Sequence, residues 1–194
     1  MKTSKNTLPQ ALLIITLITS VACQRTHDSI PADSSSVAQA DVTPPQEDLH
    51  TVVLKEDADA LRQHIAAGTD LNVKDPFGGS SPLITAALFG KTEMARLLID
   101  AGADINFQNN DGSTPLHVAA FFCRPDVVRM LLEKGADKTI KNQFGATPYA
   151  SVAAPFSEVK NTYDMMGATL EPMGLTLDYD YLQETRPEIA TLLK

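Results

Sequence analysis

Apolar residues recur at helical spacing in successive blocks of this chain, and polar residues separate the blocks. In the clearest block, Leu116, Ala119 and Ala120 form one apolar set, and Val127 with Leu131 belongs to a second set a few residues later. Apolar positions three and four residues apart predict a helix with one buried face. The pattern therefore predicts an all-α protein built from pairs of short helices.

The blocks repeat with a period of 33 residues. Ser81-Pro82-Leu83, Thr114-Pro115-Leu116 and Thr147-Pro148-Tyr149 stand at equal intervals, as do Gly102-Ala103-Asp104 and Gly135-Ala136-Asp137. Serine or threonine caps a helix N-terminus, proline suits its first turn, and glycine permits the left-handed turn that ends the next helix. Such a period predicts a solenoid of stacked helix pairs instead of one globular core.

The segment Asp111-Gly-Ser-Thr-Pro-Leu-His-Val-Ala-Ala120, together with Val127–Leu132 and the Gly-Ala-Asp turn, resembles the ankyrin-repeat family over roughly residues 46–165. The resemblance implies antiparallel helix pairs stacked side by side, with hairpin turns projecting at right angles to the helices. It also implies a partner protein bound in the concave groove between the hairpin tips and the inner helices.

Spacing within each unit predicts the boundaries. The second helix of the first unit is expected from Asp57, its N-cap, to Ala67, with Gln63 and His64 exposed. A Thr185-x-x-Glu188 capping box predicts a helix start near the C-terminus. The units are a degenerate cap repeat at 46–76, full repeats at 77–109 and 110–142, a degenerate repeat at 143–168 and a helical C-terminal cap at 169–194.

The groove positions that the resemblance assigns include five of the seven phenylalanines, and aromatic side chains dominate many protein interfaces. Phe77, Phe121 and Phe144 are expected to be available to a partner. Phe89 and Phe122 either join that surface or pack on each other within the stack. The full set is Phe77, Ser80, Leu88, Phe89, Asn110, Asp111, Ser113, Phe121, Phe122, Gln143, Phe144 and Ala146.

The N-terminal residues indicate export. Residues 1–22 contain two lysines, an apolar run from Ala11 to Ile18 and a small-residue end, the order of a signal peptide and too short for a permanent membrane span. Cys23 after Val-Ala resembles the lipidation site of bacterial lipoproteins, and Gln24 favours the outer membrane. Residues 23–45 are expected to be a disordered tether. The alternative is a cleaved signal with Cys23 near the cut by chance.

The charge of the chain limits the classes of partner that it can bind, and its cysteine content limits its chemistry. The chain has 16 basic and 24 acidic side chains, so a nucleic-acid partner is excluded and any membrane attachment depends on the lipid anchor. We expect a monomer that binds another protein. Cys123 remains as a single thiol beside Arg124; it is either reactive or a substitution tolerated in a tight turn, and we favour the second.

The remaining candidate chemistry is sparse. His117 and His50 are expected to tie adjacent hairpins together, and no two histidines have metal-ligand spacing. Asp178 and Asp180 are better explained as helix-capping acids than as a metal site. We therefore expect neither cofactor nor metal nor catalysis, and interpret the chain as an interaction scaffold of the cell envelope. The alternatives are an inhibitor or immunity protein and, less favoured, a hydrolytic or metal-dependent enzyme.

Overall fold

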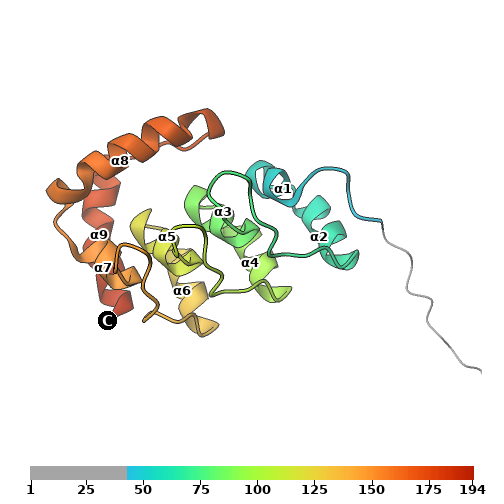
Figure 1. Ribbon diagram of the computed structural model, residues 1–194, viewed down its shortest axis with the longest axis horizontal. Coiled ribbons are helices and arrows are strands. Elements are labelled where there is room, and N and C mark those ends of the chain that lie inside the picture. The colour runs from blue at the N-terminus through green and yellow to red at the C-terminus, as the bar shows by residue number, and fades with distance from the viewer. Residues whose placement is uncertain (1–42) are drawn as a thin grey trace, which may run out of the picture. The chain divides into compact units, whose positions relative to one another are not determined.

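A computed structural model describes residues 43–194, and its helices form two stacked layers (Figure 1). The helices are α1 (Leu49–Lys55), α2 (Ala58–Ala66), α3 (Pro82–Phe89), α4 (Thr92–Asp100), α5 (Pro115–Phe121), α6 (Pro125–Glu133), α7 (Pro148–Ala153), α8 (Phe156–Leu170), the 3-10 helix η1 (Glu171–Met173) and α9 (Tyr179–Leu193). Within residues 43–194 the structure is all-helical, as the periodicity predicts.

The inner layer consists of α1, α3, α5 and α7, and each of them packs on the next along the stack. The outer layer contains α2, α4 and α6, with α9 packed beside α6 at the end. Leu83, Leu98, Leu116 and Leu131 are fully buried between the layers. Paired alanines such as Ala119 and Ala120 are fully buried as well, and their small size lets neighbouring helices approach closely.

The predicted caps form. The side chains of Ser81, Thr114 and Thr147 accept hydrogen bonds from the backbone N–H groups three residues later, at 3.3, 3.4 and 3.2 Å. Each cap precedes a proline at the first helical position, whose missing N–H costs no helical hydrogen bond. The repeated Ser/Thr-Pro pairs therefore fix where the inner helices begin.

The first unit differs from the prediction at His64. Asp57 is the N-cap of α2 and Gln63 is exposed, as expected, but His64 is buried with 4% of its surface exposed. Its Nε2 lies 2.9 Å from the carbonyl of Glu47 and its Nδ1 lies 3.2 Å from the hydroxyl of Thr69. The segment before α1 covers this side chain, so the prediction of an exposed histidine was wrong.

The C-terminal region departs most from the prediction. Helix α8 runs through Gly167 to Leu170, so the expected boundary at residue 168 falls inside a helix. The predicted capping box at Thr185 was wrong: Asp178 caps α9 two turns earlier, accepting from the N–H of Tyr181 at 3.0 Å. Thr185 is instead buried inside α9.

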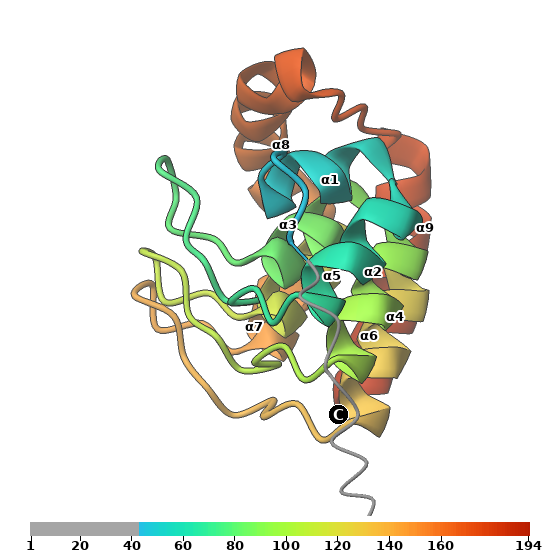
Figure 2. The same ribbon diagram turned by 90° about the vertical axis from the view of Figure 1, so that its right-hand side faces the viewer.

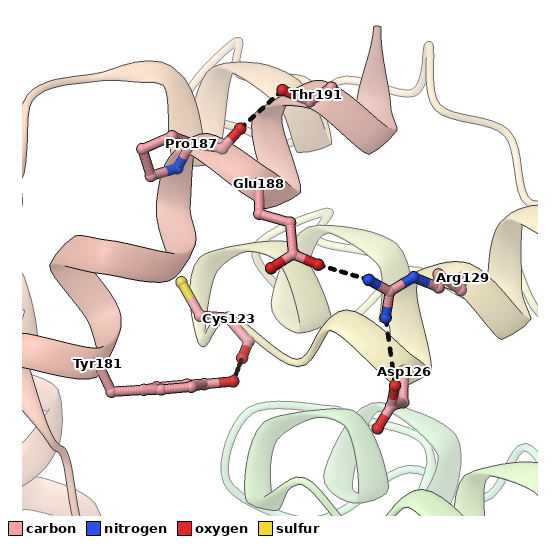
Figure 3. Close-up of polar contacts among 7 residues, drawn as sticks. All are labelled: Cys123, Asp126, Arg129, Tyr181, Pro187, Glu188 and Thr191. Carbon is pink, nitrogen blue, oxygen red and sulfur yellow. Dashed lines mark hydrogen bonds and ion pairs between the residues drawn. The ribbon is translucent and has the colours of Figure 1, made fainter.

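Helix α9 covers the end of the stack through polar contacts with the third unit (Figure 3). The hydroxyl of Tyr181 donates to the carbonyl of Cys123 at 3.2 Å, and Glu188 pairs with Arg129. Pro187 lies inside the helix, and its carbonyl accepts a hydrogen bond from the hydroxyl of Thr191 at 2.9 Å. Ile189 and Leu193 are buried on the same helix, so α9 acts as the helical cap expected at this end.

Candidate partner-binding surface

Three hairpins project from the stack, and the side chain at the base of each one fixes its conformation. Asp75 accepts hydrogen bonds from the N–H groups of Phe77 and Ser80. Asn109 and Asn142 accept equivalent bonds in the next two hairpins. Three consecutive hairpins therefore have the same internal support.

Backbone hydrogen bonds also join each hairpin to the next. The N–H of Asn110 donates to the carbonyl of Gly78 at 3.0 Å, and the N–H of Gln143 donates to the carbonyl of Asp111 at 2.9 Å. Since one backbone bond joins each neighbouring pair of hairpins, two tips cannot move apart without breaking it. The tips therefore form one continuous, preorganised edge.

Among residues 43–194, the most exposed large hydrophobic side chains lie on this edge. Phe77 and Phe144 are 88% and 78% exposed. Each stands two residues after the anchoring side chain of its hairpin, and Asp111, also exposed, occupies that position in the hairpin between them. We call Phe77, Asp111 and Phe144 the tip row. Each hairpin has two extended segments, and at the ~4.8 Å spacing of neighbouring extended chains successive tips would be roughly 10 Å apart.

The histidines of the inner helices support the hairpins. His117 Nε2 lies 3.0 Å from the carbonyl of Ala146 in the next hairpin, and its Nδ1 lies 2.9 Å from the Thr114 hydroxyl. His50 also joins its unit to the next, through different partners: its Nδ1 lies 3.0 Å from the hydroxyl of Thr85 on α3, and its Nε2 lies 3.2 Å from the carbonyl of Val73. Burial lowers the pKa of His117, which favours the neutral ring. These contacts match the structural role expected for both side chains.

The inner-helix part of the expected groove is covered by α8 (Figure 2). The ring of Tyr163 on α8 stacks on Phe121 with centroids 4.4 Å apart, and its hydroxyl donates to the Phe121 carbonyl. Phe122 is only 2% exposed and meets Phe121 edge to face. Phe122 is therefore a core residue, and Phe121 is partly buried beneath α8 instead of free for a partner.

The segment after α8 covers the next phenylalanine. A cavity of about 270 Å³ is lined by Phe89 and Leu54 on one side and by residues 173–176 on the other. Leu175 is buried there, whereas Phe89 is half-buried. The chain from α8 through η1 thus crosses back over the inner helices as far as the first unit, and we call residues 156–176 the strap.

A buried arginine holds the strap to the stack. Arg186 of α9 is 3% exposed, and its guanidinium donates to the Tyr163 hydroxyl at 2.8 Å and to the Ala154 carbonyl at 2.9 Å. Burial raises the pKa of Tyr163 to about 12, so the hydroxyl keeps its proton. Neither residue is among the predicted site residues; the available signal in the sequence was an arginine on the apolar side of a helix, between Leu182 and Ile189.

The structure brings eight of the twelve predicted groove residues to one cavity of about 450 Å³ between the inner helices, the hairpins and α8. These are Ser80, Leu88, Asp111, Ser113, Phe121, Phe122, Phe144 and Ala146. The other four, Phe77, Phe89, Asn110 and Gln143, lie outside its lining. What the resemblance implied as one open groove is thus divided into a roofed cavity and an exposed tip row.

Cys123 occupies a strained position in a buried turn. Its φ is 52°, in the left-handed region that Gly90 adopts at the equivalent place of the preceding unit. The side chain is fully buried, and burial raises the pKa of the thiol to about 11. The neighbouring Arg124 donates to the carbonyl of Leu88 at 3.1 Å. A buried, protonated thiol favours the tolerated substitution over the reactive site.

The structure bears on the expected metal sites and membrane spans, but not on the N-terminal anchor. The signal peptide, Cys23 and most of the tether lie outside the described residues. Among residues 43–194, the side chains of His, Cys, Asp and Glu form no group of three suited to a metal ion. Within the same residues, no helix has the length and apolarity needed to cross a bilayer.

Stacked helix pairs with projecting hairpins define the class of helical-repeat scaffolds. Residues 49–142 match the family model for ankyrin repeats in three copies. The crystal structure of the ankyrin repeat domain of Bcl-3, a member of the IkappaB protein family, is similar at 34% sequence identity and a TM-score of 0.52, over 53% of this chain and 45% of that one. The described structure is an ankyrin-repeat fold, and ankyrin repeats are protein-interaction modules.

A curated relative is similar over a shorter stretch. Protein PhlB of Serratia liquefaciens is 39% identical over 56 residues, which are 29% of this chain and 25% of PhlB. The chain thus spans a quarter of that relative's length and less than half of the Bcl-3 domain.

Proposed function

We propose that this protein binds a partner protein through the tip row and does not itself catalyse a reaction. The observation that carries the proposal is the pair of highly exposed rings, Phe77 and Phe144, on a rigid edge. Large exposed aromatic side chains are costly in water and are typical of contact sites. Because the edge is already ordered, a partner loses little free energy in fixing it.

The charge between the two rings specifies the partner further. Asp111 lies between Phe77 and Phe144 along the row, so a complementary surface presents lysine or arginine between two apolar side chains. The two apolar contacts would be roughly 20 Å apart, because they are separated by two hairpin spacings.

The proposed place of action is the periplasmic side of the bacterial outer membrane, where lipid on Cys23 would anchor the chain and the following residues would act as a tether. This rests on the order of charged, apolar and small residues before Cys23. Cys23→Ser should release the protein from the membrane fraction. Unchanged membrane association in that variant would refute the anchor.

Pull-down from envelope extract tests the binding surface. Phe77→Ala with Phe144→Ala should abolish capture of the partner, whereas Met173→Ala, which removes an exposed apolar side chain of the strap, should not. Capture that survives the double substitution would refute the tip row. An adaptor leaves the captured protein active; a captured enzyme that is silenced in a one-to-one complex would favour the inhibitor alternative.

A further inference from the structure

The cavity of about 450 Å³ beneath α8 has the size and lining of a small-molecule site. Its larger apolar side chains come from three helices: Ile84 and Leu88 of α3, Val118 and Phe121 of α5, and Val159, Met165 and Met166 of α8. A helix outside the repeats thus supplies one wall of a pocket whose other walls belong to the repeats.

Helix α8 spans this cavity without filling it. Tyr163 is its only buried residue, whereas Met165 is 64% exposed and Met166 is half-buried. Tyr163 anchors the helix through Phe121 and Arg186, and the methionines follow it along the chain. Methionine side chains are flexible and polarisable, so this wall adapts to differently shaped apolar ligands.

The hairpin end of the cavity is polar, and the only charge there is negative. Asn109, Ser113 and Asn142 line that end, with Asp111 beside them. Asp111 is the only lining residue that is charged at neutral pH, because the residues that line the cavity include neither lysine nor arginine and burial favours the neutral ring of His117. An anionic head group would meet Asp111 with no cation to offset the repulsion.

We propose that this cavity binds a single-chain amphiphile, with its hydrocarbon tail between Val118 and the α8 methionines and an uncharged or cationic head group at the hairpin end. The proposal is independent of the partner protein proposed above, because the cavity is already roofed by the chain's own helix. It predicts two selectivities. Affinity rises about fourfold with each additional buried methylene, and an anionic head group weakens binding.

Titration calorimetry of the whole chain with short-tailed amphiphiles, each below its micelle concentration, tests both selectivities. Decanol and decylamine should bind saturably with one site, octanol about sixteenfold more weakly than decanol because it has two fewer methylenes, and decanoate at least tenfold more weakly than decylamine. Asp111→Lys should reverse the preference between decanoate and decylamine. Absence of saturable binding, or equal affinity for decanoate and decylamine, would overturn the proposal.

Matched substitutions locate the ligand. Ala150→Phe adds a ring to the cavity wall on α7, whereas Ala153→Phe adds the same ring to an exposed position of that helix outside this cavity. Thr162→Phe and Asn161→Phe form the corresponding pair on α8. The first member of each pair should weaken decanol binding at least tenfold and the second should leave it unchanged.

Thermal melting shows whether each variant is folded. If Ala150→Phe does not fold, the pair on α8, Thr162→Phe and Asn161→Phe, provides the test. Equal decanol affinity within a folded pair would place the ligand elsewhere and refute the cavity. Phe77 lies outside the cavity lining, so Phe77→Ala should weaken capture of the partner protein and leave decanol binding unchanged, and loss of one activity without the other identifies which proposal is wrong.

Discussion

Replacing Tyr163 by phenylalanine tests whether one hydroxyl holds the strap to the stack. In the structure this hydroxyl donates to the Phe121 carbonyl and accepts from the buried guanidinium of Arg186 at 2.8 Å. A net contribution of about 1 kcal/mol for the first bond and about 1.5–3 kcal/mol for the charged one predicts a loss of about 2–4 kcal/mol of unfolding free energy. The ring itself, and its stacking on Phe121, remain.

Urea unfolding followed by circular dichroism measures this loss, and amide hydrogen exchange shows whether α8 opens first. Tyr181→Phe is the matched control: its hydroxyl also donates to a carbonyl, that of Cys123, but 42% of the residue is exposed, so water replaces the bond and the cost stays below about 1 kcal/mol. A change below about 0.5 kcal/mol in Tyr163→Phe would refute the role assigned to the hydroxyl.

Arg186→Met completes a double-mutant cycle in the same assay. Alone it removes a buried charge together with its bonds to Tyr163 and Ala154. In Tyr163→Phe the guanidinium has already lost one of its acceptors. Arg186→Met should therefore cost less unfolding free energy in Tyr163→Phe than in the wild-type chain. We expect a coupling free energy of about 1–3 kcal/mol, and additive effects would show that the two side chains act separately.

Three further predictions concern other parts of the chain. Burial lowers the pKa of His117 below its usual 6.5 in the folded state, so the unfolded chain binds the proton more readily and stability should fall as pH drops below about 6.5. In urea titrations, His117→Gln should remove this part of the pH dependence. An unchanged pH dependence in His117→Gln would refute the prediction. Burial raises the pKa of the Cys123 thiol from 9.0 to about 11. Alkylation by iodoacetamide at pH 8 should therefore be at least about a hundredfold slower in the folded chain than in urea. Equal rates in the two states would show an accessible thiolate. Phe77→Ala and Phe144→Ala should each change unfolding free energy by less than about 0.5 kcal/mol, whereas Leu116→Ala should cost about 2–5 kcal/mol; a large loss at either phenylalanine would mean that its ring is part of the core.

The repeats were predictable because each of their elements is specified locally. Thr114, Pro115 and the turn at Gly135 determine a helix start and a helix end whatever surrounds them, and the period places the next unit. Predictions from local sequence were wrong where a residue's burial depends on a segment far away in the chain. His64 lies in the sequence like an exposed residue of a terminal repeat, and its burial depends on Glu47, 17 residues away.

The candidate site was only partly predictable because it, too, depends on contacts between distant segments. The family pattern assigns groove positions from the repeats alone, and these positions include the exposed Phe77 and Phe144 and eight of the nineteen residues that line the cavity. The pattern contains no information about α8, whose path depends on the contact between Tyr163 and Phe121, 42 residues apart. Phe121 was therefore expected on an open surface that the chain itself covers, and the pattern could not decide between surface and stack for Phe122.

The strap changes what the repeats can bind. In an open groove, inner-helix side chains and hairpin tips would contact one partner together, so affinity would draw on both. With α8 fixed over Phe121, a protein partner reaches the tips while the inner helices face a largely apolar cavity that α8 partly covers. The exposed rings on the outer edge and the roofed cavity behind them are then two sites of different chemistry, joined by Asp111 and Phe144, which belong to both. A ligand that moves either side chain would therefore alter the surface that the other ligand meets.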